Sequence, residues 1–200
     1  MLTTQNASSR KQEIDELMSG SELAIAIIEE SHLSDALDVE LRGFLMRAFP
    51  DGGTSFAQTR YWHGSAPVYS VIARLDGKVV AHAGVIVRDI RVGGQPVRIY
   101  GIQNMGVLPE ARGAGAGLRV LETVAGEAVR RGIAFGVLFC IPELERYYRR
   151  NGWEPHNVAV RMNYDGQDNI PIPGKNICMV KRLTDAVFPK GEIHLQGADW

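Results

Sequence analysis

Cysteine is scarce in this 200-residue chain, and an excess of charge of either sign is absent. The two cysteines, Cys140 and Cys178, lie far apart in apolar stretches and supply neither a disulfide framework nor a metal-binding spacing. We expect buried thiols in a reducing compartment. The five histidines also lack the spacing of metal ligands, so no metal is expected. The formal net charge of −1 gives no bulk attraction to nucleic acid or to an anionic membrane surface, which excludes both as expected partners.

Long hydrophobic runs are absent as well. Apolar stretches such as residues 79–87 are interrupted by polar side chains and are far shorter than the roughly 20 residues that span a bilayer. Residues 1–11 are polar and lack the apolar core of a secretory signal. With 45% hydrophobic and 22% charged residues, the composition is that of a globular protein. We therefore expect a cytoplasmic protein.

The chain length suits one domain, and no repeat or low-complexity tract divides it. Residues 1–20 are rich in Ser, Gln, Thr and Glu, and we expect a flexible leader or an appended helix there. Residues 21–200, including the C-terminal tail, are expected to form a single domain.

The order of β-rich and helical segments predicts a mixed α/β (α+β) sheet. Asp76-Gly77 and Gly93-Gly94 signal tight hairpin turns, so three consecutive antiparallel strands are expected in the middle of the chain. A loop rich in Pro and Gly is expected at 170–174. The predicted strands cover residues 22–29, 68–75, 78–87, 97–107, 133–140, 158–164 and 177–181, and the predicted helices cover residues 37–48, 118–131 and 142–150.

One segment, residues 105–118, indicates a particular chemistry. It predicts a strand end, a short turn, a glycine-rich loop and a long helix. Gly113, Gly115 and Gly117 let the backbone approach a ligand without Cβ atoms in the way. Their amides and the helix dipole favour an anion, most naturally a phosphate, and Arg112 adds a positive charge at the rim. The spacing fits neither the GxGxxG dinucleotide fingerprint nor the Gly-Lys-Ser/Thr phosphate loop.

Two motifs in the second half of the chain together resemble a known family. Arg112-x-x-Gly115-x-Gly117 matches the Arg/Gln-x-x-Gly-x-Gly/Ala signature of GNAT N-acetyltransferases, and residues 107–109 match the strand end that leads into it. Downstream, Tyr148 precedes Gly152 by four residues, as in the family's LYxxxGF segment. The two matches occur in the family's order, about the family's distance apart. The resemblance covers roughly residues 22–165.

The resemblance implies a GNAT fold, in which a mixed, mostly antiparallel sheet is flanked by helices and its fourth and fifth strands splay apart. It also implies acetyl-coenzyme A as the acyl donor, with coenzyme A as the product and the pantetheine arm between those strands. Two sets of cofactor contacts are then expected. In the first set, backbone groups pair with pantetheine and polarise the thioester carbonyl; these belong to Met105, Gly106 and Val107. The other holds the pyrophosphate, namely Arg112, Gly113, Ala114, Gly115, Ala116 and Gly117.

The same resemblance gives Tyr148 the role of general acid, which protonates the leaving thiolate. Alternatively, Tyr148 is a core aromatic, which is the role we expect for Tyr147. The proton on the acceptor ammonium needs another route, because many relatives carry Glu where this chain has Gln103, followed by Asn104. Water, backbone carbonyls or an amine that arrives neutral would each provide one. His82, in a predicted strand, is interpreted as a hydrogen-bonded structural histidine.

Within the family, the chain resembles aminoglycoside 2′-N-acetyltransferases and, more distantly, nodulation-type acyltransferases that acylate chitooligosaccharide amines. The similarity lies in residues 79–84 with Arg88, in the long fourth strand and in the last residues of the tail. It implies that the acceptor is the primary amine of a small molecule, and the expected acceptor is an amino sugar or an aminoglycoside antibiotic. The biological role that it implies is antibiotic resistance. The expected substrate-binding residues are Asp51, Gln103, Asn104, Asp199 and Trp200.

Several alternatives stay open. Asp51 lies in Pro-Asp-Gly-Gly, where Asp commonly forms a turn, and Trp200 is either a pocket wall or an anchor for the tail. The acceptor could instead be an oligosaccharide, a polyamine, an amino acid or a protein N-terminus. A different class is a non-catalytic module that binds acyl-coenzyme A as a sensor. Late strands and tails of such folds often form dimers, so a homodimer is also open.

Overall fold

The structure, a computed structural model, describes residues 23–173 and 176–200, and the predicted leader at 1–20 lies outside the described residues. The strands are β1 (Leu23–Glu29), β2 (Tyr69–Leu75), β3 (Lys78–Val92), β4 (Gln95–Val107), β5 (Phe135–Cys140), β6 (Glu154–Pro155), β7 (Val160–Tyr164), β8 (Gln167–Pro171), β9 (Ile177–Arg182) and β10 (Ile193–His194). The helices are α2 (Asp35–Ala48), α3 (Gly53–Phe56), α4 (Ala116–Arg130) and α5 (Glu145–Arg150), with 3-10 turns η1 (Glu30–His32), η2 (Pro50–Gly52), η3 (Pro109–Ala111) and η4 (Pro142–Leu144).

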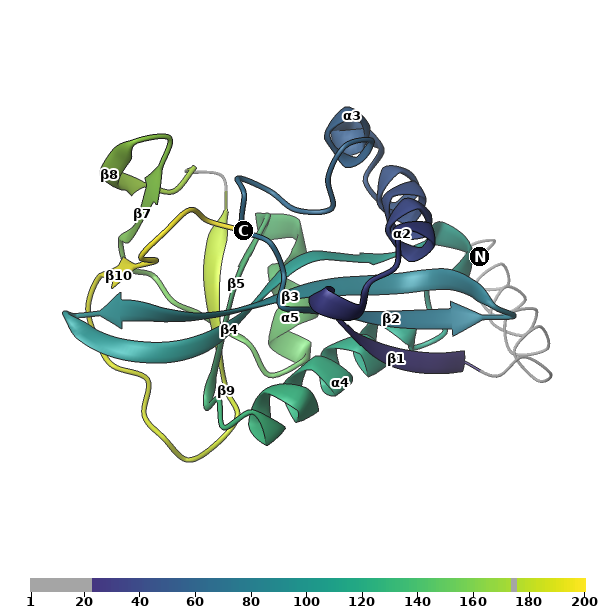
Figure 1. Cartoon of the computed structure of the whole chain (residues 1–200). Coiled ribbons are helices and arrows are strands. Elements are labelled where there is room, and N and C mark those ends of the chain that lie inside the picture. The colour runs from purple at the N-terminus through teal and green to yellow at the C-terminus, as the bar shows by residue number, and fades with distance from the viewer. Residues whose placement is uncertain (1–22, 174–175) are drawn as a thin grey trace, which may run out of the picture.

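The strands of the described chain form one twisted sheet (Figure 1). Its order is β6-β9-β5-β4-β3-β10-β7-β8, and β2 pairs with the first half of β3 and with β1. Both predicted hairpins are confirmed. Asp76-Gly77 has φ of 51° and 77°, and Gly93-Gly94 has φ of 54° and 81°, the left-handed values that a type I′ turn requires.

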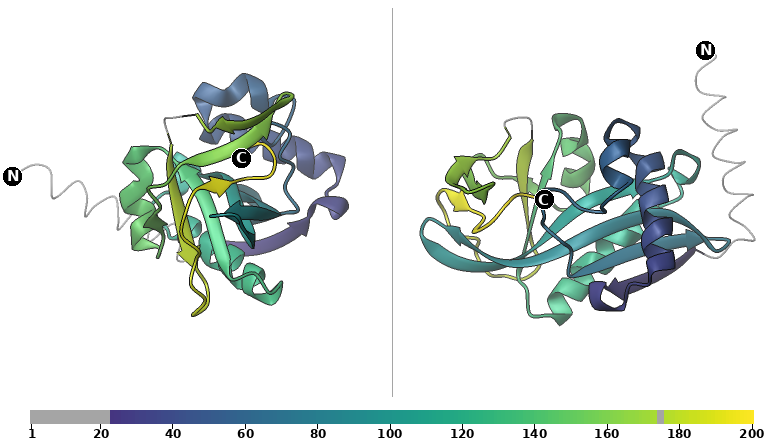
Figure 2. Two further views of the ribbon diagram at one scale, coloured as in Figure 1. Left: turned by 90° about the vertical axis from the view of Figure 1, so that its left-hand side faces the viewer. Right: turned by 45° about the horizontal axis from the view of Figure 1, so that its top comes forward.

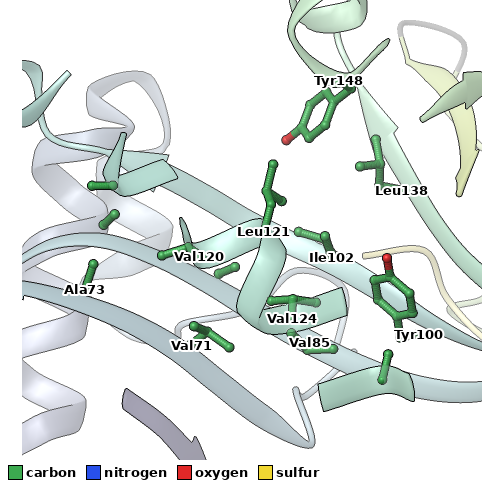
Figure 3. Close-up of a cluster of buried hydrophobic side chains, with 14 of the residues drawn as sticks. Val71, Ala73, Val85, Tyr100, Ile102, Val120, Leu121, Val124, Leu138 and Tyr148 are labelled. Carbon is green, nitrogen blue, oxygen red and sulfur yellow. The ribbon is translucent and has the colours of Figure 1, made fainter. Parts of the chain in front are cut away.

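Helices cover both faces of the sheet. The predicted apolar side of α4 packs on one face through Val120, Leu121 and Val124, which Figure 3 shows beside Val85 and Ile102. α2 lies on the opposite face, because neighbouring β2 residues alternate between the two clusters. Ser34 is the N-cap of α2, because its hydroxyl accepts a hydrogen bond from the N–H of Leu37 (3.3 Å).

β4 and β5 run in parallel over four residue pairs and then separate. The pairing ends at Ile102↔Leu138. Beyond that point β4 continues to Val107 beside β3, while β5 continues to Cys140 beside β9. The predicted splay of the fourth and fifth strands is therefore confirmed, and it leaves one edge of β4 unpaired with β5.

The C-terminal segment returns to the centre of the sheet (Figure 2). β10 pairs antiparallel with the end of β3 and parallel with β7. The last residues then lie beside the segment that follows α3, where the Ser65 hydroxyl donates to the Asp199 carbonyl (2.7 Å). Residues more than 130 positions apart are thereby held together next to the splay.

Three regions of the chain differ from the sequence prediction. Between the strands predicted at 158–164 and 177–181, where only a loop at 170–174 is expected, lies β8, which pairs with β7 across Asp165-Gly166, a turn with φ of 51° and 71°. The loop expected after the first predicted helix begins with η2 and α3, and the tail contains β10. None of the helices within the described ranges has the length and apolarity that a membrane crossing needs.

Candidate active site

A cavity of about 670 Å³ opens between the end of β4, the start of α4 and α5. We call it the glycine-loop cavity. The structure brings to it all of the predicted cofactor residues except Ala114. These lining residues are Met105, Gly106, Val107, Arg112, Gly113, Gly115, Ala116 and Gly117.

The loop before α4 presents backbone amides to this cavity. Gly113 and Gly115 have φ of 88° and 78°, and Gly115 is an N-cap that offers no capping side chain. The N–H of Arg119 donates to the Gly115 carbonyl (3.0 Å), so the amides of the preceding turn have no carbonyl to bond within the helix. Since the first turn carries no acidic side chain, the arrangement suits an anion. Arg112 is exposed at the rim, and its Nε donates to the Val107 carbonyl (3.2 Å).

The free edge of β4 offers a second set of backbone groups. The N–H of Leu108 donates to the Val80 carbonyl on β3 (2.9 Å). Because successive N–H groups of a strand point to opposite edges, the N–H of Val107 is directed toward the splay. An extended chain laid in the splay could therefore pair with β4 as an additional strand would.

β4 carries a bulge beside the splay. The pairing register shifts between His82 and Gly84, so Asn104 and Met105 lie opposite a single residue of β3. Asn104 has φ of 51°, a left-handed value that asparagine tolerates better than most residues. Its side-chain amide donates to the Arg60 carbonyl (2.7 Å).

His82 supports the bulge from beneath. Its Nδ1 lies 3.1 Å from the Asn104 carbonyl and its Nε2 lies 3.2 Å from the Ser70 hydroxyl. A carbonyl can only accept, so Nδ1 carries the proton and Nε2 accepts from Ser70. Burial lowers the pKa of His82 to about 4, which keeps the ring neutral. The interpretation of His82 as a hydrogen-bonded structural histidine is confirmed.

Of the two adjacent tyrosines on α5, Tyr148 is the buried one. It is 6% exposed, packs edge-on against Trp153 and extends its hydroxyl toward the space above Leu121 (Figure 3). Burial raises the pKa of Tyr148, so the phenol stays protonated, as a general acid requires. Tyr147 is 37% exposed, so the prediction that it is a core aromatic is wrong. Both tyrosines line the glycine-loop cavity.

A second cavity, of about 440 Å³, adjoins the first. We call it the tail cavity, because the end of the chain forms one wall. Both cavities are lined by Phe49, Met105, Leu144 and Tyr148. Four of the five predicted substrate-binding residues also line the tail cavity, namely Gln103, Asn104, Asp199 and Trp200. Asp51 is exposed in η2 and lines neither cavity. Its place in this turn agrees with the alternative that Asp51 is a turn-forming residue.

Gln103 and Trp200 have fixed positions in the tail cavity. The amide nitrogen of Gln103 donates to the Ser65 carbonyl (2.7 Å), while its Oε1 is buried with no hydrogen-bond partner in the described structure. The Trp200 ring packs on Gly101, lies 5.1 Å from the Phe139 ring and has the Arg88 guanidinium 5.3 Å from its centroid. Trp200 is thus both a cavity wall and an anchor for the tail.

His63 is the residue of this site that sequence reasoning missed. Its Nδ1 contacts the Asp199 carboxylate, and its ring centroid lies 4.7 Å from that of Tyr164. His63 lines the tail cavity together with Trp62. No local signal marks it, because the loop is irregular and Asp199 lies 136 positions away.

Solved structures with the same architecture include a GNAT family N-acetyltransferase (YhbS) of Escherichia coli in complex with CoA. It matches with a TM-score of 0.56 and 17% identity over 87% of this chain and 89% of that one. A GNAT family acetyltransferase of Brucella melitensis in complex with acetyl-CoA matches with a TM-score of 0.53 and 21% identity, over 85% and 94% of the two chains. At these identities the match shows the fold alone, and the predicted GNAT fold is confirmed.

A narrower assignment comes from the sequence. Residues 21–172 match the family model of Nodulation protein A (NodA), so the chain belongs to the NodA family. Nodulation protein A of Mesorhizobium plurifarium is 30% identical over 129 residues, which are 62% of this chain and 63% of that protein. The chain therefore spans just under two thirds of this relative. Of the two resemblances inferred from the sequence, the nodulation-type one is supported, and the aminoglycoside one stays a prediction.

Proposed function

We propose that this protein is an N-acyltransferase that moves an acyl group from acyl-coenzyme A to the primary amine of an amino sugar. The observation that carries the proposal is the meeting of two cavities at Tyr148, beside the splay of β4 and β5. One cavity offers backbone amides for a pyrophosphate, and the other offers polar groups for an acceptor. An acyl transferase needs the two substrates to meet in this way.

The transfer follows from these positions. Pyrophosphate binds the amides before α4, with Arg112 at the rim, and pantetheine pairs with the free edge of β4. A β4 amide near Val107 then stabilises the negative charge that develops on the thioester oxygen, an effect typically worth ~3 kcal/mol. The amine nitrogen attacks the acyl carbon, the C–N bond forms and the C–S bond breaks. Tyr148 gives its proton to the leaving thiolate.

The lining of the tail cavity favours an acceptor with few positive charges. Asp199 is the one acidic side chain among its described lining residues, whereas a polycationic aminoglycoside calls for several. Aromatic rings of Trp62, Phe139 and Trp200 add flat apolar walls, and the unpaired Oε1 of Gln103 can accept from one N–H or O–H. Membership in the NodA family agrees with an amino-sugar acceptor, because the nodulation-type acyltransferases that the sequence resembles acylate such amines.

The test is release of coenzyme A thiol from acyl-coenzyme A in the presence of single amines. Glucosamine and its β-1,4-linked oligomers should be acylated faster than an aminoglycoside, spermidine or an amino acid. Each amine is offered with acetyl and with longer acyl donors, which also defines the acyl length. Preference for a different amine would overturn the acceptor class. Tight binding of acyl-coenzyme A with no transfer to any amine would instead indicate a non-catalytic sensor.

A further inference from the structure

β4 contributes Gln103 to the tail cavity, at the position where many relatives carry Glu. Gln cannot accept a proton, so β4 supplies no carboxylate that could deprotonate the acceptor ammonium. The titratable side chains among its described lining residues are His63, Cys140, Tyr148 and Asp199. Burial raises the pKa of Cys140 to about 11 and also raises that of Tyr148, so both carry their protons at neutral pH. His63 and Asp199 are left as proton acceptors, and they contact each other.

We infer that His63 is the general base that takes the proton from the acceptor ammonium, with Asp199 as its positioning residue. This inference rests on the proposed function and assigns a role within it. Nδ1 of His63 faces the Asp199 carboxylate, which fixes that nitrogen as the protonated one. Nε2 then carries the lone pair that can accept a proton. The same division between a base and the residue that orients it recurs in nucleophilic enzymes on unrelated folds.

The surroundings hold this pair in one arrangement. Ser65 donates its hydroxyl to the Asp199 carbonyl (2.7 Å), and its own carbonyl accepts from the Gln103 amide (2.7 Å). Arg88 donates to the Ala198 carbonyl (2.6 Å) and to the Ser65 hydroxyl (3.2 Å). Hydrogen bonds therefore connect the loop that carries His63 to the tail and to β4.

The backbone at His63 is consistent with a positioned group. His63 has φ of 48°, and the next residue, Gly64, has φ of 75°. A left-handed conformation at a residue other than glycine costs on the order of 1 kcal/mol and is common where a side chain must be aimed. The charged and titratable groups around the ring are Asp199 on the tail, Tyr164 on β7 and Arg88 on β3, which acts through Ser65.

The proton balance is complete with these groups. The acceptor enters as an ammonium, His63 Nε2 takes one proton, and the neutral amine attacks the acyl carbon. The tetrahedral intermediate collapses with cleavage of the C–S bond, the nitrogen gives its second proton to water, and the thiolate takes its proton from Tyr148. Tyr148 then regains a proton from water, so the turnover releases one net proton. The His63 side chain is 34% exposed, so the imidazolium can pass its proton to water before the next turnover.

The experiment replaces His63 with asparagine, which tolerates the left-handed backbone and can still bond to Asp199. With glucosamine as the acceptor and acetyl-coenzyme A as the donor, we expect H63N to lower kcat/KM roughly 10²-fold at pH 7. The loss should shrink as the pH rises and the acceptor becomes neutral by itself. Asp199→Asn should give a smaller loss, roughly 10-fold, with a shifted pH profile. Exposed His32, in η1, supplies the matched control His32→Gln, which should leave the profile unchanged.

Hydroxylamine separates a base from a structural residue, because this nucleophile is already neutral at pH 7. H63N should retain its transfer to hydroxylamine and its coenzyme A affinity. Equal losses with both nucleophiles, or an unchanged pH profile with glucosamine, would overturn the role of base. If H63N fails to fold, the Asp199→Asn profile decides the same question. A wild-type protein that acylates no amine would reject the proposed function itself, before any variant is compared.

Discussion

The two cavities that meet at Tyr148 are built in different ways. The glycine-loop cavity draws most of its functional groups from one continuous stretch, residues 105–118, and most of these groups are backbone amides. The tail cavity collects side chains from widely separated parts of the chain, among them His63, Gln103 and Asp199. A site made of main-chain groups can hold one constant ligand, such as a cofactor, whereas a site made of side chains can vary with the acceptor. We expect mutations to separate the two cavities accordingly.

The largest effect is expected where the cavities meet. Tyr148→Phe keeps the ring that packs against Trp153 and removes the hydroxyl, so the fold and the coenzyme A affinity should be retained. If Tyr148 protonates the thiolate, kcat should fall roughly 10³-fold, or about 4 kcal/mol. Steady-state kinetics and calorimetric titration with coenzyme A measure the two quantities. Tyr147→Phe is the matched control and should change kcat little. Equal activity of the two variants would leave Tyr148 as a core aromatic.

The two cavities also differ in how well the sequence predicts them. Gly113, Gly115 and Gly117 lie within five residues and predict a ligand-binding loop. In the structure all three line the glycine-loop cavity. The tyrosine pair shows the limit of such reasoning, because α5 is less than two turns long and its periodicity cannot decide which ring is buried. Local signals also found both hairpins, and Asp165-Gly166 offers the same turn signal for β7 and β8.

The tail cavity could not be assembled from the sequence, because its parts meet through tertiary contacts alone. β10 is two residues long and exists through its pairing with β3 and β7. That pairing carries Asp199 to His63, across 136 positions. Residues at the end of the tail were recognisable by resemblance, whereas His63 has no neighbour in sequence that marks it.

The second largest effect concerns the bulge that serves both cavities. The pKa of His82 falls from 6.5 to about 4 on folding, so between these pH values the unfolded chain binds a proton that the folded chain does not. The stability due to neutral His82 is therefore present above pH 6.5 and is lost as the pH falls toward 4, by about 3 kcal/mol. His82→Gln should be less stable at pH 7 and should flatten this pH dependence. Urea unfolding at several pH values measures how the free energy of unfolding depends on pH. The same pH dependence in the variant and the wild type would contradict this role of His82.

Two glycine substitutions should act on one cavity each. A Cβ at Gly117 would lie 2.9 Å from the Tyr147 hydroxyl and 3.0 Å from Val107, so Gly117→Ala should narrow the glycine-loop cavity. We expect the KM for acyl-coenzyme A to rise roughly 10-fold, about 1.4 kcal/mol, with little change in the KM for the amine. Gly115 is a poorer probe, because its φ of 78° strains any side chain.

The mirror variant is Gly101→Ala, whose Cβ would lie 2.5 Å from the Trp200 ring. It should displace that wall and raise the KM for the amine by a similar factor, with the KM for the donor unchanged. Gly126→Ala, in α4, is the control for both, because its Cβ meets no described atom within 4 Å. Thermal unfolding monitors the cost of crowding. If both crowded variants raised both KM values equally, the division into two cavities would fail.

The smallest effect is expected at the rim of the glycine-loop cavity. Arg112 is exposed, so its attraction to a pyrophosphate is screened by solvent and should contribute about 1 kcal/mol at most. Arg112→Gln should weaken coenzyme A binding roughly five-fold at low salt and less at high salt, with no change in the KM for the amine. Titration calorimetry at two ionic strengths measures this, with exposed Arg146→Gln on α5 as the control. If main-chain amides of the loop hold the pyrophosphate, binding should survive in the Arg112 variant. Complete loss would mean that the side chain, and not the main chain, makes the site.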